Sequence, residues 1–207
     1  EPVVVALNAE ATSISSASSH TCATTSTGGV KCWGLNSSGQ LGDNSLTNSS
    51  TPVDVIGLTD ATNVAAGGSF ACTTTTAGAV KCWGAGATGA GSAYRQPIPA
   101  NVIGLSSGVK SLSAGGSHAC AVTAAGSIRC WGSNNNGQLG NGTRNDATSP
   151  TEVLDLTNAI AVSGGANHTC AIMSDSSARC WGSRYNGALG DGQHGGAITT
   201  RPVAVGG

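Results

Sequence analysis

The sequence predicts an all-β fold of the β-propeller type, built from four tandem repeats. Eight cysteines fall into four pairs with identical internal spacing, and each second cysteine opens a Cys-Trp-Gly triplet. A period of about 50 residues is typical of solenoids, propellers and arrays. Aromatic residues make up only 3% of the 207 residues and charged residues only 9%. Because disordered chains are usually highly charged, this composition favours many short strands joined by tight turns.

The cysteine pairs predict one disulfide within each repeat. The four pairs are Cys22 with Cys32, Cys72 with Cys82, Cys120 with Cys130, and Cys170 with Cys180. Between Cys72 and Cys82, threonine and valine runs favour strands, and Ala77-Gly78 supplies a turn. Folding this segment about Ala77 places the two cysteines opposite each other, within disulfide range. Disulfides in turn indicate an oxidising compartment.

Zinc binding is the alternative interpretation of the same cysteines. His20, His118 and His168 each lie two residues before the first cysteine of a pair, on the same face of its strand. The motif lacks the short spacing between cysteines that structural zinc sites use. The second repeat also carries Phe70 in the histidine position, which indicates packing. We therefore predict no metal site and no cofactor.

The residue pattern within each repeat predicts four short strands, which is the number in a propeller blade. Thr51–Val55 alternates in polarity, Ala61–Ala66 is a strand of small residues, and the cysteine hairpin supplies two more. We treat residues 1–207 as one repeat domain. Its approximate units are 2–51, 52–98, 99–149 and 150–201, with 202–207 as a partial next strand.

Three short motifs recur around the cysteine hairpin. In the third repeat they read Gly-Gly-Ser-His-Ala-Cys (115–120), Trp-Gly-Ser-Asn-Asn-Asn-Gly-Gln-Leu-Gly (131–140) and Pro-x-x-Val (150–153). Together they resemble the repeat of the regulator of chromosome condensation family over essentially the whole chain. The paired cysteines depart from the general family pattern and resemble secreted bacterial members. The loop at 84–91 also departs, because it lacks the Asn, Gln and Leu of its sister repeats.

The resemblance implies a β-propeller of four-stranded antiparallel blades, commonly seven of them. It also implies several different functions. Members act as nucleotide exchange factors for a small GTPase, as chromatin binders or as bacterial protein inhibitors. Because one fold carries all of these, the resemblance does not choose among them.

The two ends of the chain repeat the same strand-like segment. Residues 1–5 and 201–205 both match the Pro-Val run at 51–55. Since the chain starts with neither a signal peptide nor an initiator Met, we expect a processed chain or an excised segment. A spare strand could close a four-bladed ring or pair with another copy. The sequence leaves open a closed ring, a segment of a longer chain and a subunit of an assembly, and we favour the last two.

Charge and motifs exclude several classes of function. The net charge is −1, and the nine basic residues form no cluster that would bind nucleic acid or an anionic membrane. No stretch approaches the ~20 apolar residues of a membrane span. The Gly-x-Ser-x-Gly, phosphate-loop and His-Glu-x-x-His motifs are missing from the sequence. We predict no catalytic residues and expect the protein not to be an enzyme.

The candidate interface residues lie in two divergent loops and at the two ends. They are Tyr94, Arg95, Arg184 and Tyr185 in the loops, and Pro2, Val3, Val4, Val5, Pro202, Val203 and Val205 at the ends. Tyr and Arg are favoured at interface hot spots. We predict an extracellular, secreted or cell-surface structural repeat protein that assembles with itself into oligomers or filaments through its end strands. The alternative is a propeller whose loops bind another extracellular protein or a glycan, as an inhibitor or adhesin does.

Overall fold

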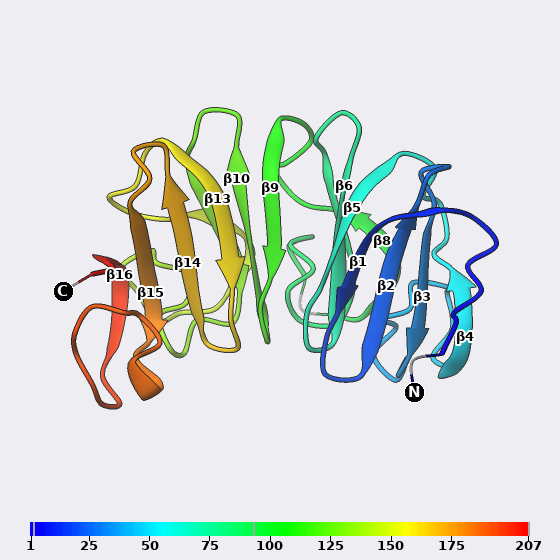
Figure 1. Cartoon of the computed structure of the whole chain (residues 1–207), viewed down its shortest axis with the longest axis horizontal. Helices are drawn as coiled ribbons and strands as arrows, with labels where there is room; N and C mark the ends of the chain where they lie inside the picture. The colour runs from blue at the N-terminus through cyan, green and yellow to red at the C-terminus, as the bar shows by residue number, and fades with distance from the viewer. Residues whose placement is uncertain (2, 93, 207) are drawn as a thin grey trace.

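Four antiparallel sheets of four strands follow one another along the chain (Figure 1). The computed structural model describes residues 1, 3–92 and 94–206. In each sheet, here called blades 1 to 4, consecutive strands are hydrogen-bonded neighbours. The strands are β1 (Ala11–Ser16), β2 (His20–Thr25), β3 (Val30–Gly34) and β4 (Ser49–Asp54) in blade 1; β5 (Ala61–Ala66), β6 (Phe70–Thr75), β7 (Val80–Gly84) and β8 (Gln96–Asn101) in blade 2; β9 (Val109–Ala114), β10 (His118–Thr123), β11 (Ile128–Gly132) and β12 (Ala147–Glu152) in blade 3; and β13 (Ala159–Gly164), β14 (His168–Met173), β15 (Ala178–Ser183) and β16 (Ile198–Ala204) in blade 4.

The cysteine hairpin forms the two middle strands of every blade, as predicted. In blade 2, Cys72 lies opposite Cys82 in the register of β6 and β7, and their Cα atoms are 4.0 Å apart. The predicted pairing is confirmed in the other three blades, where the bridges join Cys22 with Cys32, Cys120 with Cys130, and Cys170 with Cys180. In each of these blades the two bridged cysteines are again directly opposed in the strand register.

A glycine turns the hairpins of blades 1 to 3, and Ser176, with φ of +67°, takes its place in blade 4. Gly78 has φ of +72°, and a Cβ there would meet the backbone nitrogen of Gly108 at 2.7 Å. Glycine therefore allows both the turn and the close approach of the next blade.

The Pro-Val segment is the outermost strand of the blade that precedes it. Asp54 of β4 lies opposite Lys31 of β3, so β4 completes the sheet that holds the Cys22–Cys32 bridge. A free edge tolerates Pro52, which has no N–H to donate. The blades thus end near residues 54, 101, 152 and 204, whereas the sequence units placed this strand first. Residues 201–204 belong to β16 of blade 4, and no strand lies over residues 3–5.

Each blade packs face to face on the next, in chain order. The innermost strands contact one another as β1 with β5, β5 with β9 and β9 with β13. Three buried hydrophobic clusters join blades 1 and 2, blades 2 and 3, and blades 3 and 4. Among the described residues, no such cluster joins blade 4 to blade 1. The blades therefore form an open arc whose ends are blade 1 and blade 4, on the right and left of Figure 1.

Helical structure is minimal. Within the described residues it amounts to one 3-10 turn at Tyr185–Gly187 in the last loop. No helix in this part of the chain is long and apolar enough to cross a membrane.

Candidate functional site

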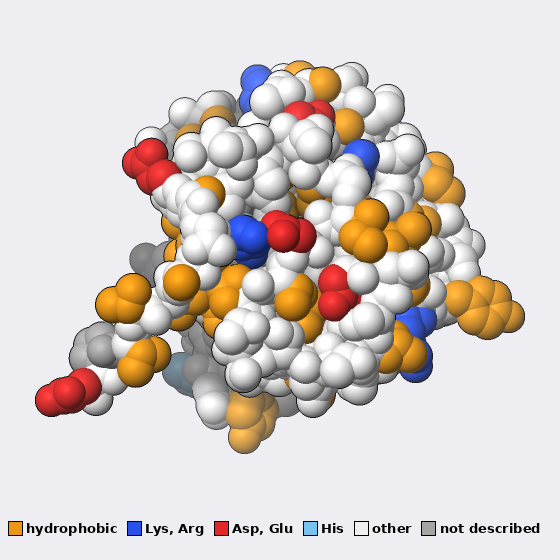
Figure 2. Space-filling view, turned by 90° about the vertical axis from the view of Figure 1, so that its right-hand side faces the viewer, with side chains coloured by type: hydrophobic (Ala, Val, Ile, Leu, Met, Phe, Trp, Pro, Cys, Tyr) orange, Lys and Arg blue, Asp and Glu red, His pale blue; other side chains and the backbone are white. Residues whose placement is uncertain are grey.

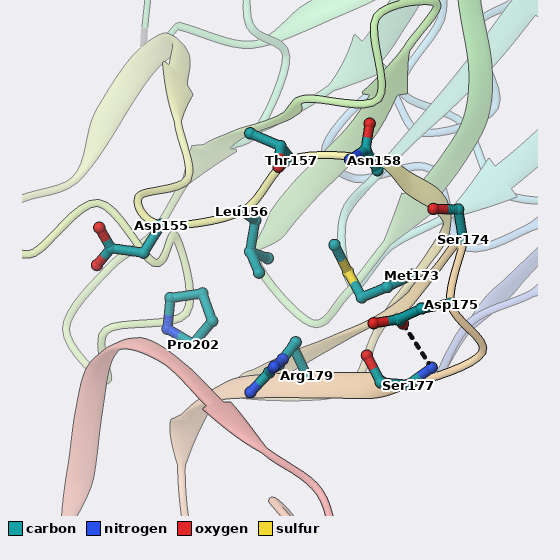
Figure 3. A pocket seen from close by; sticks show the side chains of 10 residues that line it. All are labelled: Asp155, Leu156, Thr157, Asn158, Met173, Ser174, Asp175, Ser177, Arg179 and Pro202. Atoms are coloured by element: carbon teal, nitrogen blue, oxygen red, sulfur yellow. Dashed lines mark hydrogen bonds between the residues drawn. The ribbon is translucent and has the colours of Figure 1, made fainter.

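A surface hollow of about 500 Å³ lies where blade 3 leads into blade 4 (Figure 3). Asp155 and Asp175 lie on opposite sides of it, with Leu156 and Met173 between them. The carboxylate of Asp175 accepts a hydrogen bond of 2.9 Å from the backbone N–H of Ser177, as in a capped turn. On the other side, Asp155 forms an ion pair of 2.6 Å with Arg201. Both carboxylates of this polar recess therefore already have partners within the protein.

Metal ligands do not converge in the part of the chain that the structure describes. No group of three His, Cys, Asp or Glu residues forms a possible site there. The eight cysteine sulfurs are all in disulfides and are not available as thiolate ligands. Of the histidines considered as zinc ligands, His20 and His118 are buried and His168 is partly exposed.

One tryptophan side chain lies at each of the three contacts between neighbouring blades. The Nε1–H of Trp83 donates to the carbonyl oxygen of Gln40, in the loop of the preceding blade, at 3.0 Å. Trp131 donates to Ala87 at 2.9 Å and Trp181 to Gln138 at 2.8 Å in the same way. All three tryptophan side chains are fully buried. Blades 1, 2 and 3 thus each supply a loop carbonyl that receives the tryptophan of the next blade.

The loop that supplies this carbonyl is fixed by a buried asparagine and a buried leucine. In blade 3, Asn134 accepts a 2.9 Å hydrogen bond from the N–H of Leu139 and donates to the side chain of Asn141. Leu139 is fully buried in the cluster between blades 3 and 4. Blade 2 reaches the same geometry with a shorter loop, in which Ala87 supplies the carbonyl and Thr88 is buried.

In the last loop, an ion pair replaces the asparagine. Arg184 stands three residues after the blade's tryptophan, as Asn134 does, and its Nε donates to Asp191 at 2.7 Å. Both side chains are largely buried. The hydrogen bond from Arg184 is the main reason why the pKa of Asp191 lies below its ordinary value. Arg184 therefore holds its own loop together.

Two histidines are buried between blades. The Nε2 of His118 lies 2.8 Å from the hydroxyl of Thr169 in blade 4, and that hydroxyl donates to the carbonyl of Gln138 at 2.9 Å. Because the threonine proton is used in this way, His118 is the donor, as a neutral ring with its proton on Nε2. Burial, with a smaller contribution from His168, lowers the pKa of His118 to about 4. Burial likewise lowers the pKa of His20 to about 4.

The two end faces of the arc expose residues that are buried at the internal contacts. On blade 1, Ile14 is 65% exposed, whereas the residues in its register are 5 to 8% exposed: Val64, Leu112 and Val162. On blade 4, Val205 is 41% exposed, against 2 to 4% for its counterparts Val55, Val102 and Val153. Ile172 is 49% exposed, whereas Val122 in its register is buried. Figure 2, seen from the side of blade 1, shows hydrophobic patches that alternate with separate basic and acidic side chains.

The predicted interface residues are not brought together at one site. Tyr94 and Tyr185 are 84% and 71% exposed in the loops of different blades. Arg95 is also exposed, and Arg184 is paired as described. Val3, Val4 and Val5 are exposed outside any strand, and Pro2 lies outside the described residues. Pro202 and Val203 are half-buried in β16, and Val205 follows that strand.

Sequence reasoning named Val205 at the end of blade 4, but it missed Ile172 on the same face and Ile14 on the face of blade 1. The signal was present, since Ile14 occupies the register of Val64 and Trp33 that of Trp83.

Known structures share this fold. The chain matches human WBSCR16 with a TM-score of 0.84 and 19% identity, over 98% of this chain and 54% of that one. It matches Prp20p of Saccharomyces cerevisiae with a TM-score of 0.82 and 23% identity, over 93% and 49%. Yeast RCC1 (Prp20) bound to Kap60 gives 0.81 and 22%, over 93% and 48%. The chain therefore spans about half the length of these structures. No curated protein matches its sequence.

Two family models identify the repeats, and both describe the regulator of chromosome condensation (RCC1) repeat. One matches residues 27–73 and 125–172, and the other matches 11–40, 109–138 and 159–188. Together they cover well over half of the chain and include parts of all four blades. With the four-stranded blades and the shared fold, these matches show that the chain belongs to the regulator of chromosome condensation repeat family.

Proposed function

We propose that this chain is a secreted, disulfide-stabilised β-propeller scaffold that acts by binding protein at the end faces of its arc. One observation carries the proposal: the end faces expose side chains that are buried at every internal contact between blades. Ile14 and Val205 are 65% and 41% exposed, against 8% or less for their counterparts. Exposed apolar surface of this kind marks interaction sites.

Three further features support this proposal. The four disulfides fit an extracellular or cell-surface location, because such bonds persist in oxidising compartments. Binding of protein also occurs in similar folds. Structures of Prp20p concern its binding to Gsp1p and histones and its complex with Kap60. Fully burying a side chain such as Ile14 contributes about 1.5–3 kcal/mol, so a few of them can hold a partner.

The proposed contact uses blade faces rather than strand edges. The N-terminal Pro-Val segment suggested pairing through end strands, but residues 3–5 form no strand. Blade 4 already has its fourth strand, β16. Face packing instead continues the arrangement seen between blades 1 and 2, 2 and 3, and 3 and 4.

Site-specific photo-cross-linking tests the proposal. A benzophenone amino acid replaces Ile14 or Ile172 in the chain as its native host secretes it. Ile56 and Ile103, which are 48% and 53% exposed beside internal blades, serve as matched control positions. We expect adducts of discrete mass at positions 14 and 172 but not at 56 and 103. Equal labelling at all four positions, or no adduct at 14 and 172, would overturn the proposal.

The exposed tyrosines favour a second candidate function, which is recognition of a protein or glycan by the loops. Tyr94 and Tyr185 are the two tyrosines of the chain, and both point largely into solvent. Tyrosine supplies rigid contact area at low entropic cost. The same cross-linker at positions 94 and 185 separates the two candidates, since loop recognition predicts adducts there and none on the end faces.

A further inference from the structure

The end faces of blade 1 and blade 4 are complementary to each other. We propose that their partner is a second copy of this chain, which docks head to tail so that blade 1 of one copy packs on blade 4 of the next. This inference rests on the proposed function and names its partner. It follows from four matches between the free faces and the internal contact of blades 3 and 4.

The first match is the receiving loop of blade 4. Ala188 and Leu189 follow Trp181 at the same distance as Gln138 and Leu139 follow Trp131. Leu189 is buried like Leu139, so this loop is already folded in the receiving form. A Cβ on Gly140 would meet the indole of Trp181 at 2.8 Å. A Cβ on the corresponding Gly190 would meet only Val205 among the described residues.

The second match is the tryptophan of blade 1. Trp33 lies opposite Thr21 in β2, as Trp181 lies opposite Thr169 in β14. Trp181 is fully buried under the loop of blade 3, whereas Trp33 is partly exposed. Within the described residues no carbonyl accepts the Nε1–H of Trp33. Docking on blade 4 of another copy brings this N–H to the carbonyl of Ala188.

The third match is a histidine–threonine pair. At the contact of blades 3 and 4, His118 donates to Thr169. The same positions hold His20 and Ala71 between blades 1 and 2, and Phe70 and Ala119 between blades 2 and 3. On the free faces these positions hold His168 on blade 4 and Thr21 on blade 1, both partly exposed. Head-to-tail docking therefore reproduces the polar pair of the third contact.

The fourth match is made by the inner strands. Between blades 3 and 4, the backbone N–H of Gly164 donates to the hydroxyl of Ser113 at 2.9 Å. The corresponding positions on the free faces are Ser16 of β1 and Ser163 of β13. The N–H of Ser16 would donate to the hydroxyl of Ser163. Ile14 then covers the apolar face of blade 4, which has a hollow of about 250 Å³ lined in part by Ile172 and Ala178.

Such a contact joins two different surfaces, so it can repeat. Heterologous contacts produce rings where the rotation closes and filaments where it does not. Because one copy carries one face of each kind, two damaged copies can still form one intact contact between them. This property separates head-to-tail docking from a symmetric dimer.

The test measures the solution mass of the purified, oxidised chain from about 1 to about 100 µM, the range to which a micromolar affinity responds. We expect the mass to rise from the 20.0 kDa of one chain to at least twice that value. Ile14→Glu and Ile172→Glu should each remain at the mass of one chain. Ile103→Glu, at a similarly exposed site beside an internal contact, should assemble like the wild type.

A mixture of the two end-face variants is the decisive measurement. The intact blade 4 of Ile14→Glu should bind the intact blade 1 of Ile172→Glu, giving a 1:1 dimer that grows no further. Trp33→Ala, which removes the docking indole, should behave like Ile14→Glu. A wild-type chain that stays at 20.0 kDa throughout, or a variant mixture without dimer, overturns the inference. Adducts of positions 14 and 172 to a different protein would overturn it while leaving the proposed function intact.

Discussion

At the scale of single residues, the buried histidines link stability to pH. His20 and His118 occupy the same register in blades 1 and 3, and burial lowers the pKa of each to about 4. In the unfolded chain their pKa is about 6.5. Between these values the unfolded state binds protons that the folded state does not. The free energy of unfolding therefore falls as the pH drops through this window, and the stabilisation is fully present above it.

Replacement of His20 by phenylalanine should remove one part of this pH dependence. Phe70 fills the same position in blade 2, where it is fully buried, but a Cβ on Gly67 would clash with its ring and blade 1 carries Ala17 at that position. The prediction therefore concerns the change in stability between two pH values and not the absolute stability of the variant. Between pH 7 and pH 4.5 the variant should lose about 2–3 kcal/mol less free energy of unfolding than the wild type. Urea unfolding at both values measures this. His194→Gln, at an exposed site, should follow the wild type, and equal losses in all three proteins would refute the assignment.

Residue roles were only partly predictable from the sequence. The exchange of His for Phe70 indicated packing, and His20 and His118 are indeed buried. Arg184 was assigned to an interface because it stands beside a tyrosine, yet it pairs with Asp191. The clue was the seven-residue spacing that it shares with Asn134 and Asn141. Arg184 and Asp191 form an ion pair where Asn134 and Asn141 form an amide hydrogen bond. Because the residue types differ, the sequence did not show that the two pairs occupy equivalent positions.

At the scale of elements, the loop after each Cys-Trp-Gly triplet couples neighbouring blades. Leu139→Ala should cost about 2–5 kcal/mol of folding free energy, because it removes a fully buried side chain between blades 3 and 4. Leu46→Ala is the matched control, since Leu46 is 47% exposed in the corresponding loop of blade 1. Urea unfolding of both variants checks this, and similar losses would show that the loop does not hold the blades together.

The hairpin bridge stabilises its blade through the unfolded chain. The double variant that combines Cys72→Ala with Cys82→Ala should lose about 2–3 kcal/mol, as expected for a closed loop with a sequence separation of 10 residues. Combining Cys170→Ala with Cys180→Ala opens a loop of the same size in the end blade and should cost a similar amount. Thermal and urea unfolding provide the measurement. Unchanged stability in both variants would refute this role of the bridges.

Strands were easier to predict than their membership of a blade. Local preferences and the spacing of Cys72 and Cys82 gave the hairpin and its register. The same reasoning was confirmed for Cys120 with Cys130 and for Cys170 with Cys180.

Local preferences did not show that Pro52 belongs to the sheet of the preceding hairpin. That choice depends on hydrogen bonds between β3 and β4, whose partners are far apart in the chain. Strand propensity contains no information about which neighbour a strand selects.

At the scale of the whole molecule, the oxidised state is a direct prediction. The native chain should show no free thiols without reductant and eight after reduction in denaturant, since every cysteine is bridged. Thiol counting measures both numbers. Eight thiols in the unreduced protein would contradict the bridges and, with them, the argument for an oxidising compartment.

The repeat number and the blade architecture followed from the sequence, but the open arc did not. Four equal repeats are compatible with a closed ring as well as with an arc. The difference depends on the angle between neighbouring blades, which no local motif encodes. It becomes visible only in side chains such as Ile14 and Val205, which would be covered if blade 4 met blade 1.

The disulfides have a consequence for how such a chain can change in evolution. Each bridge joins two cysteines of one hairpin, and none crosses from one blade to another. A gene duplication or deletion that adds or removes one whole repeat therefore leaves no cysteine without its partner. Since the loop carbonyl and the tryptophan recur with the same period, the new unit also meets matching neighbours on both sides. The number of blades can thus change in single steps without mispaired intermediates.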